Sequence, residues 1–399
     1  KEADHVEGFS PELATVTHAG GKELEEPLII RPTSETIINH MFSKWIKSHR
    51  DLPMLINQWA NVVRWEMRTR LFLRTSEFLW QEGHTAHQTK EEATEEALQM
   101  LDIYEEFTQN IAAVKVIKGT KSEIEKFAGA KVTYSIEAMM LDRKALQAGT
   151  SHELGQNFSK AFEIQYSDEN NQLAHPYQTS WGVSTRLIGM IIMAHGDDKG
   201  LKLPPAIAPT QCVVIPIIPK NSDSEHILTI ARGIKDLLPG IRVHIDDRTE
   251  VSPGYKFNEW ELKGVPIRIE IGPKDIEQNS VVVARRDVED SKKPMALDSL
   301  NEDIPALLDL IQRDMLKVTE EFLEINTHHV EDMDELIKKL NDTEGFVSCY
   351  WSEDKEDELK IKELTKATIR CYPLENTNQE ISVNKPNIEG KFVIFSKSY

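Results

Sequence analysis

A cluster of prolines divides this chain into two parts that follow different sequence patterns. The segment LKLPPAIAPTQ, residues 201–211, contains three prolines, and proline disrupts both helices and the hydrogen bonding of central strands. Before this segment, strand-like runs are mixed with amphipathic helices, whereas after it short apolar strands alternate with helices. A single architecture therefore does not fit the whole chain, and we expect a domain boundary near residue 205.

The first part combines helical periodicity with strand-like runs. Apolar residues recur at helical spacing over residues 34–48, 90–111 and 181–198, which predicts three helices. The earliest of these begins at Ser34, a residue type that caps helix starts. The segment 161–182 has the pattern of a strand, a polar turn and a second strand.

The second part has the alternating pattern of a small α/β domain. Its predicted strands are residues 212–218, 241–246, 266–271 and 280–286. A helix over residues 224–238 and a shorter one over 258–263 separate them, and this alternation indicates a largely parallel sheet. Beyond residue 300 we expect helices over 303–325 and 333–341, followed by a tail that ends in GKFVIFSKSY.

The composition is that of a globular protein long enough for two or three domains. Of its 399 residues, 40% are apolar and 28% are charged. No apolar run approaches the roughly 18 residues that suggest a membrane span, so we expect no membrane contact. A net charge of −19 disfavours unselective binding to nucleic acid, and a polyanionic partner would have to meet a local basic patch.

The cysteine content and the first residues indicate where such a chain resides. Only three cysteines occur, which argues against a disulfide framework and for a reducing compartment. We therefore expect a cytoplasmic protein. The first residue is Lys1 and the opening KEADHVEGFS has no apolar signal core, so we expect the chain to start inside a longer protein.

Residues 62–87, VVRWEMRTRLFLRTSEFLWQEGHTAH, place arginines and carboxylates among aromatic residues along an expected strand pair. A guanidinium binds phosphates and carboxylates through two parallel hydrogen bonds. Such a hairpin can present Arg64 and Arg74 to a triphosphate and Phe78 to a planar base. The alternative is a half-buried hairpin held by ordinary cross-strand ion pairs.

Four motifs occur along the chain in this order: RPTSE, RWE…RTSEFLWQEGHTAH, GTSHELGQNFSK and SWGVSTR. Together they resemble the prolyl-tRNA synthetases, a family of class II aminoacyl-tRNA synthetases, and the resemblance covers essentially the whole chain. It implies an antiparallel-sheet catalytic domain over residues 1–205, an α/β anticodon-binding domain over 206–300 and a small α+β domain over 301–399. The interval before GTSH is too short for an inserted editing domain, which is like the archaeal and eukaryotic type.

The resemblance implies an enzyme that activates L-proline with ATP to prolyl-adenylate and transfers the prolyl group to the 3′ end of tRNA(Pro). Arg64 would bind the α-phosphate and the prolyl carboxylate, and Arg74 the outer phosphates, with Mg²⁺ bridging them. Phe78 and Arg186 would sandwich the adenine. The implied catalytic residues are Arg64, Arg74 and Arg186, and the implied ATP-binding residues are Arg64, Glu66, Arg74, Glu77, Phe78, Gln147, Thr150 and Arg186.

The proline pocket is implied in the same way. The ring amine of proline is a secondary ammonium with two N–H donors, and Thr33 and Glu35 of RPTSE would accept from it. Trp80, His152 and Phe9 would form walls around the pyrrolidine ring, and Ser180 and Arg64 complete the implied set. Taken alone, His152 would be interpreted as a structural histidine. An apolar wall rejects larger side chains but discriminates weakly against smaller ones such as alanine.

The segment SPGYKFNEWELKGVPIRIEIGP resembles the part of the family that reads the anticodon. Unstacked tRNA bases are recognised by hydrogen bonds to their edges and by stacking. The residues implied to contact tRNA are Lys256, Glu259, Trp260, Glu261, Arg285 and Arg286. For each of them, an ordinary solvated helix face with i,i+4 ion pairs is the alternative.

The C-terminal segment departs from a common pattern of the family. Many relatives carry a cysteine-rich zinc site there, and a closed zinc site needs four ligands. After residue 330 only Cys349 and Cys371 are present, with no histidine, so we expect a zinc-binding-like domain without structural zinc. Tyr399 matches the C-terminal tyrosine of the family, whose carboxylate is expected to point toward the catalytic domain.

A second departure is the first class-defining motif, which builds much of the dimer interface in this family. It should lie before KEADHVEGF and is largely absent. By resemblance we still expect a homodimer. The alternatives are a catalytically silent, tRNA-binding regulator and a related synthetase for threonine or glycine. The first usually lacks the phosphate-binding arginines that are present here, and a threonyl enzyme needs a zinc-bound pocket that PTSE and GTSH do not supply.

Overall fold

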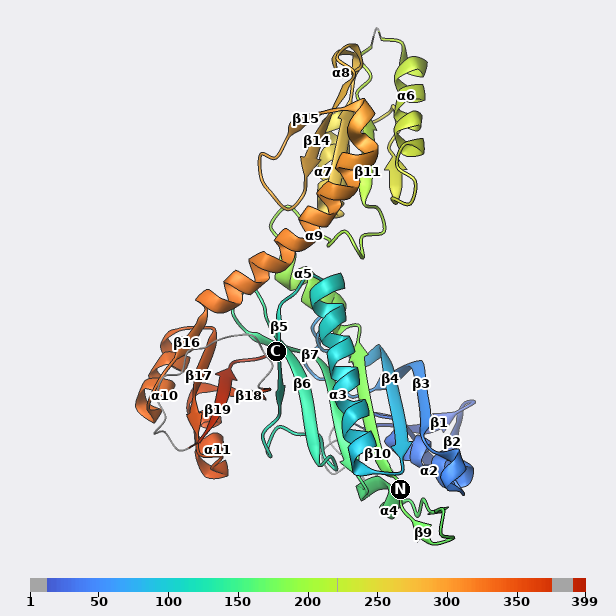
Figure 1. Cartoon of the computed structure of the whole chain (residues 1–399), viewed down its shortest axis with the longest axis vertical. Helices are drawn as coiled ribbons and strands as arrows, with labels where there is room; N and C mark the ends of the chain where they lie inside the picture. The colour runs from blue at the N-terminus through green and yellow to red at the C-terminus, as the bar shows by residue number, and fades with distance from the viewer. Residues whose placement is uncertain (1–12, 221, 375–389) are drawn as a thin grey trace. The chain divides into compact units, whose positions relative to one another are not determined.

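The computed structural model describes residues 13–220, 222–374 and 390–399 (Figure 1). Two compact units are present. The first contains Lys1–Glu106, Val116–Met190 and Ile325–Tyr399, and the second contains Phe107–Lys115 and Ile191–Glu324. Phe9 lies outside the described residues.

A ten-stranded sheet is the frame of the first unit. In spatial order its strands are β16 (Thr327–His329), β17 (Phe346–Trp351), β19 (Lys391–Ser396), β18 (Thr368–Pro373), β5 (Val116–Thr120), β6 (Val132–Met139), β7 (Ala145–Gly155), β10 (Tyr177–Ser184), β4 (Glu77–His87) and β3 (Met54–Val63). Neighbouring strands are antiparallel, except that β16 and β17 are parallel. Strands from the last quarter of the chain therefore extend the sheet that the first half begins.

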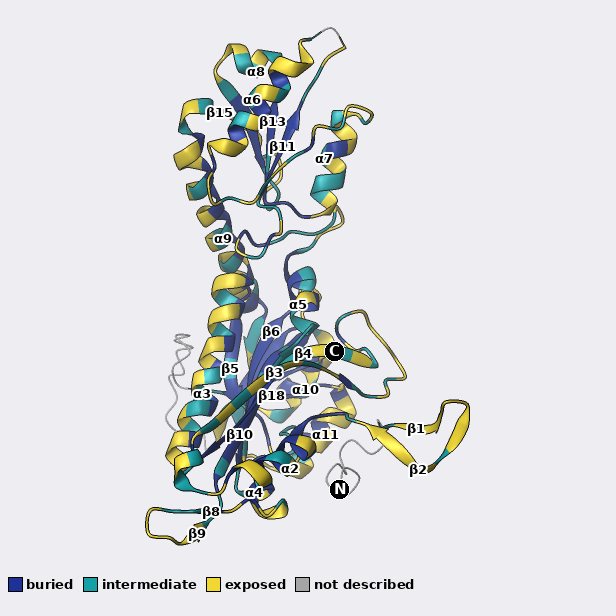
Figure 2. Cartoon of the chain, turned by 90° about the vertical axis from the view of Figure 1, so that its right-hand side faces the viewer, coloured by how far each residue is buried: buried dark blue, intermediate teal, exposed yellow. Residues whose placement is uncertain are grey.

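Helices and small hairpins surround this sheet. The helix α3 (Lys90–Glu106) packs over β7 and β10 through Ala93, Ala97 and Leu101, which recur at helical spacing and are buried. The other helices of the unit are α2 (Glu35–Trp45), the short 3₁₀ turn His49–Asp51, α4 (Asn157–Ala161), the start of α5 (Arg186–His195), α10 (Met333–Asp342) and α11 (Lys355–Thr365). Two separate hairpins pair β1 (Ala14–Ala19) with β2 (Lys22–Ile30) and β8 (Tyr166–Ser167) with β9 (Leu173–Ala174). The first hairpin is exposed along most of its length (Figure 2).

The second unit is built on a mixed five-stranded sheet. Its strands, in spatial order, are β12 (Val243–Ile245), β11 (Cys212–Pro216), β13 (Ile267–Ile271), β14 (Ser280–Arg285) and β15 (Lys293–Ala296). The first three are parallel and the last two antiparallel. Its helical elements are the π-helical turn Phe107–Ile111, the rest of α5, α6 (Ser224–Asp236), α7 (Pro253–Leu262), α8 (Pro273–Glu277), the 3₁₀ turn Leu297–Ser299 and α9 (Leu300–Ile325).

Both faces of this second sheet are covered next to β11, and this inner strand is apolar at every position. Cys212 and Val214 of β11 point to a core formed with α6 and α9, whereas Val213 and Ile215 pack against Phe257 and Trp260 of α7. A strand that is buried on both faces is expected to be continuously apolar. This burial explains the run CVVIPII, whose strand residues are all buried.

Some expected elements differ from those observed. The α/β sheet is parallel over only three strands, because β14 and β15 turn back as a meander. The helix expected over 258–263 begins at Pro253, where Ser252 accepts a hydrogen bond from the backbone N–H of Tyr255. Within 161–182, the polar turn forms the β8–β9 hairpin and α4 ends inside the segment. Within the described parts of the chain, no helix combines the length and the apolar character needed to cross a membrane.

Candidate active site

One cavity of the first unit gathers most of the residues predicted to bind proline and ATP. Its volume is about 270 Å³, and it opens over β4, β7 and β10. The predicted residues that line it are Thr33, Glu35, Arg64, Phe78, Trp80, Gln147, Thr150, His152, Ser180 and Arg186.

The strand β10 aligns the two sides of this cavity, because it pairs with β4 on one side and with β7 on the other. Ser180 lies opposite His84 on β4 and opposite His152 on β7. Residue 83 is glycine, which leaves room for the Trp181 ring, because a Cβ atom there would lie 2.0 Å from that ring. The position of Trp181, which lines the cavity, therefore depends on this glycine.

Two buried oxygen groups stand side by side on the segment that leads into α2. The Thr33 hydroxyl donates a hydrogen bond to the carboxylate of Glu35, and both residues are buried and line the cavity. A carboxylate and a hydroxyl in contact can each accept one N–H of a secondary ammonium. This pair fits the cationic end of a cyclic amino acid.

His152 contributes an uncharged ring to the same wall. Its Nδ1 lies 3.0 Å from the Thr133 hydroxyl, and its ring packs on Phe127 with centroids 4.8 Å apart. Burial, and secondarily the nearby His84, lowers the pKa of His152 to about 3. The neutral imidazole therefore does not repel a bound ammonium.

Three further polar atoms of the cavity residues are buried without a hydrogen-bond partner in the described part of the chain. They are the Ser180 hydroxyl and the indole N–H groups of Trp80 and Trp181. An unsatisfied buried polar group costs about 1–3 kcal/mol, so such atoms in a cavity wall are available to a ligand.

Three arginines meet in an adjoining cavity of about 220 Å³. Arg64, Arg74 and Arg186 all line it, and the two cavities share Arg64, Phe78, Ser184 and Arg186. Burial, followed by the charges of Arg74 and Arg64, lowers the pKa of Arg186. Guanidinium groups held close to one another favour a multiply charged anion between them.

The protein scaffold fixes two of these guanidinium groups. Arg64 donates from Nε to the Pro32 carbonyl at 2.9 Å, and its Cζ lies 5.3 Å from the Phe78 ring centroid. Arg186 donates to the Leu73 carbonyl from Nε and Nη2, at 3.3 and 3.1 Å. Arg74 is half exposed and forms an ion pair with Glu66 at 3.6 Å.

Glu66 and Glu77 differ in position, although both were predicted in the ATP site. Glu66 lines the arginine cavity. Glu77 is exposed and accepts a hydrogen bond from Asn61 at 2.6 Å, and it lines neither cavity.

The sequence interpretation missed Glu82, His84, Glu125, Phe127 and Thr133, which also line the main cavity. Glu82 accepts hydrogen bonds from Ser34 and Gln58 and lies 3.0 Å from His84. Burial alone would raise the pKa of Glu82, but these contacts, led by that with His84, lower it. Trp80, Glu82 and His84 are alternate residues of one strand and therefore lie on the same face. Because Trp80 was predicted in the pocket, this alternation could also have identified Glu82 and His84.

Comparison with known proteins agrees with this arrangement. A family model described as the tRNA synthetase class II core domain (G, H, P, S and T) matches residues 15–195. An anticodon binding domain matches residues 211–307, and a prolyl-tRNA synthetase C-terminal domain matches residues 333–399. A proline–tRNA ligase of Natranaerobius thermophilus is 53% identical over 401 residues, which cover 100% of this chain and 83% of that protein. The chain belongs to the prolyl-tRNA synthetase family.

Other members of the prolyl-tRNA synthetase family extend the comparison. The chloroplastic/mitochondrial proline–tRNA ligase of Arabidopsis thaliana is 54% identical over 100% of this chain and 75% of its own length. Crystal structures of the Cryptosporidium parvum prolyl-tRNA synthetase match with TM-scores of 0.93. One, with halofuginone and AMPPNP, is 44% identical over 99% of this chain and 84% of that chain. Another, with L-proline and AMP, is 42% identical over 100% of this chain and 83% of that chain.

These comparisons confirm the class II fold expected from the sequence. The alignment with the Natranaerobius thermophilus protein is no longer than about the length of this chain. The aligned part of that protein therefore has no room for an inserted editing domain. Relatives that lack an insertion at this place thus include a bacterial protein.

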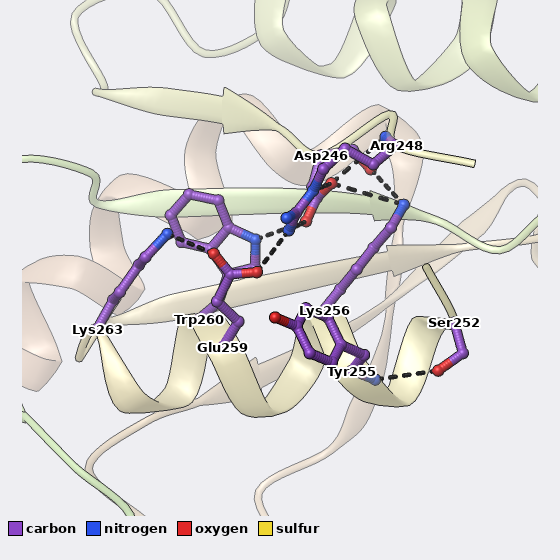
Figure 3. A network of polar contacts seen from close by, with 8 residues as sticks. All are labelled: Asp246, Arg248, Ser252, Tyr255, Lys256, Glu259, Trp260 and Lys263. Carbon is purple, nitrogen blue, oxygen red and sulfur yellow. Dashed lines mark hydrogen bonds and ion pairs between the residues drawn. The ribbon is translucent and has the colours of Figure 1, made fainter. Parts of the chain in front are cut away.

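In the anticodon-binding part of this prolyl-tRNA synthetase family member, three predicted tRNA contacts take part in one internal polar network (Figure 3). Buried Lys256 donates to the Asp246 carbonyl at 2.8 Å, and the Trp260 indole N–H donates to the Asp246 carboxylate at 2.8 Å. Glu259 accepts from Arg248 and Lys263 at 2.8 and 2.7 Å. Burial alone would raise the pKa of Asp246, but hydrogen bonds from Arg248 and Trp260 hold it well below its usual range.

The other three predicted tRNA contacts line a separate cavity of about 300 Å³. Glu261, Arg285 and Arg286 line it, and so does Trp260 from the polar network. Arg285 pairs with Asp287 and Asp314, each at 2.6 Å, and Arg286 pairs with Asp197 at 2.5 Å. Both guanidinium groups thus have carboxylate partners inside the second unit.

The C-terminal residues expected to matter lie within the first unit. Arg74 donates from Nη2 to a C-terminal oxygen of Tyr399 at 3.3 Å. Burial raises the pKa of the Cys349 and Cys371 thiols to about 12. Among the described residues no group of His, Cys, Asp and Glu side chains is arranged to hold a metal ion.

Proposed function

We propose that this chain is a proline–tRNA ligase that forms prolyl-adenylate from L-proline and ATP and then transfers the prolyl group to tRNA(Pro). The observation that supports this most directly is the order of charges across the two cavities. A carboxylate and a hydroxyl, Glu35 and Thr33, lie in the same cavity as Arg64, and three arginines line the cavity that adjoins it. An amino acid has its ammonium and carboxylate at opposite ends, and a nucleoside triphosphate supplies the polyanion.

In the first reaction, a carboxylate oxygen of proline attacks the α-phosphorus of ATP, and the bond to pyrophosphate breaks. Thr33 and Glu35 hold the ring ammonium, and Trp80 and His152 enclose the ring. Arg64 contacts both the carboxylate and the α-phosphate, which aligns them and stabilises the charge that develops during the displacement. No covalent intermediate with the enzyme is required.

The nucleotide occupies the side of the site that is lined by Phe78 and Arg186. Arg74 holds the outer phosphates, and Gln147 and Thr150 approach the ribose and the phosphates. Mg²⁺ enters with ATP as part of the substrate, and Glu66 contributes a carboxylate to the lining of the arginine cavity. In the second reaction, a hydroxyl of the terminal ribose of tRNA attacks the prolyl carbonyl carbon, and AMP leaves.

We assign residues 1–205 to the catalytic domain, 206–300 to the anticodon-binding domain and 301–399 to a C-terminal domain that functions without zinc. We place the enzyme in the cytoplasm, in keeping with three unpaired thiols, and cell fractionation tests this location.

A homodimer is supported by exposed apolar residues on one face of β3 and β4. The strand β3 ends the sheet, and on the face of the sheet opposite α2, Leu55 and Trp59 of β3 and Leu79 of β4 are 55%, 83% and 60% exposed. A patch of large apolar residues on an edge strand favours an intermolecular contact, and we assign a second copy of the chain to it.

Proline-dependent exchange of pyrophosphate into ATP tests the proposed function. We expect exchange with L-proline and none with threonine or glycine. Exchange that requires another amino acid would reassign the pocket, and binding of tRNA without any exchange would make the chain a silent relative.

A further inference from the structure

The segment between β5 and β6, residues 121–131, joins the main cavity to the C-terminal part of the chain. It supplies Glu125 and Phe127 to the cavity wall. The Phe127 backbone N–H donates to the Thr133 hydroxyl at 3.0 Å, and that hydroxyl also contacts His152. The position of this segment therefore sets the wall against which the amino acid packs.

The beginning of the segment is fixed by a buried charge cluster. Lys121 donates to the Glu137 carboxylate at 2.6 Å and to the Arg370 carbonyl at 2.7 Å. The Arg370 guanidinium donates to the same carboxylate at 2.8 and 3.0 Å. All three side chains are at least nine-tenths buried, and Arg370 belongs to β18, in the C-terminal part.

Two further contacts come from a single helix, α11. The Ser122 hydroxyl donates to the Glu358 carboxylate at 2.6 Å, and Lys362 pairs with Glu125 at 2.9 Å. Residues four apart on a helix lie on the same face, so Glu358 and Lys362 present one acceptor and one donor to the segment. The last of these contacts, at Glu125, lies two residues before Phe127.

From this geometry we propose that α11 of the C-terminal part positions the wall of the amino-acid pocket, with Glu358 and Lys362 as positioning residues that act through Ser122, Glu125 and Phe127. The proposal rests on the proposed function. It assigns to α11 a role in the affinity for proline rather than in the chemical step, because its contacts through Glu358 and Lys362 lead to the pocket wall and not to the three arginines of the ATP side.

Charge reversal within the Lys362–Glu125 pair is the test, because Lys362 is exposed and can be changed without emptying the core. In proline-dependent pyrophosphate exchange, Lys362→Glu should raise the KM for proline roughly 5-fold, since attraction between the partners becomes repulsion. The kcat and the KM for ATP should change less than 2-fold, because the substitution acts on the binding of proline and not on the ATP site or the chemical step. Combining Lys362→Glu with Glu125→Lys should bring the KM for proline back toward the wild-type value.

The matched control is Lys360→Glu, the same charge change on an exposed residue of the same helix, which should leave the KM for proline unchanged. Equal KM values for Lys362→Glu and wild type would overturn the proposal, and so would a double variant no better than Glu125→Lys alone. A parallel loss of kcat and melting temperature would also overturn it, because it would indicate a merely structural contact. A wild-type enzyme without proline-dependent exchange would instead overturn the proposed function.

Discussion

At the scale of single residues, Arg64 is the group on which both halves of the site depend. It lines both cavities, and its guanidinium is already oriented by the Pro32 carbonyl and by Phe78. We predict that Arg64→Ala lowers pyrophosphate exchange by about 3 kcal/mol in the transition state, roughly 150-fold, because charge pairing at the reacting groups is lost.

The matched control for this prediction is Arg68→Ala, since Arg68 is an exposed arginine of the same loop that lines neither cavity. Exchange by this control should remain near that of the wild type. Near-normal exchange by Arg64→Ala itself would remove Arg64 from the mechanism.

His152 gives the site a pH dependence whose sign can be worked out. Its pKa in the folded protein is about 3, below the roughly 6.5 of an exposed histidine. Between these values the unfolded chain binds a proton that the folded site excludes, so acidification favours unfolding by up to about 1.4 kcal/mol per pH unit. The free energy of unfolding of His152→Gln should therefore fall less steeply between pH 6.5 and 5 than that of the wild type.

The control for this pH effect is His226→Gln, which changes an exposed histidine of α6 and should keep the wild-type slope. The measurement is denaturant unfolding at several pH values. Identical slopes for wild type and His152→Gln would mean that His152 is not held neutral by burial.

Sequence reasoning found the arginines and missed the buried carboxylate of Glu82, which also lines the main cavity, for a physical reason. Arg64, Arg74 and Arg186 belong to motifs whose residue types point to phosphate binding. Glu82 is fully satisfied by Ser34, Gln58 and His84, and these partners lie as far as 48 residues away. The alternation along β4 places Glu82 and His84 on one face, but it does not identify Gln58, which the pairing of β4 with β3 brings opposite Glu82, or Ser34, which lies just before α2.

At the scale of elements, α7 is held in place by Asp246. This single carboxylate, with its backbone carbonyl, receives contacts from Arg248, Lys256 and Trp260. We predict that Asp246→Ala destabilises the second unit by about 3–5 kcal/mol, because a buried cation then lacks its partner. Pyrophosphate exchange should be affected far less than charging of tRNA.

Asp247→Ala is the matched control, since Asp247 is the exposed neighbour in the chain and its replacement should leave stability within about 0.5 kcal/mol of the wild type. Thermal unfolding monitored together with exchange and tRNA charging checks both. Loss of exchange equal to the loss of charging in Asp246→Ala would contradict a division of labour between the two parts.

The elements themselves were predictable where their signals are local. The helices and strands of the second unit follow from apolar periodicity, and the two faces of β11 explain its continuous apolar run. The early start of α7 follows from Ser252–Pro253, a cap and first-turn proline that the sequence interpretation overlooked. The sequence could not predict whether Lys256 faces tRNA or Asp246. A charged residue of an amphipathic helix fits the sequence pattern equally well whether it binds a ligand or pairs with another residue of the protein.

At the scale of the whole molecule, the apolar edge of the first unit predicts the oligomeric state. We expect Trp59→Glu to convert a dimer into a monomer, because a charge would have to be desolvated in the interface. Light scattering after size-exclusion chromatography measures the mass. Leu364→Glu, at an apolar residue of α11 that is also about half exposed, should remain dimeric. A wild-type monomer, or a dimeric Trp59→Glu variant, would exclude this face as the interface.

The ten-stranded sheet has a consequence for how the chain is made on the ribosome. Thr120 of β5 pairs with Tyr372 of β18, and Gly119 permits their close approach, since a Cβ there would lie 2.5 Å from that of Cys371. About 250 residues must therefore be translated between the two strands, which takes roughly 12–50 s at 5–20 residues per second. During that time the nascent chain carries β5 as an unpaired edge, the kind of surface that recruits other strands. Chains whose translation stops early should consequently depend on chaperones more than full-length chains do.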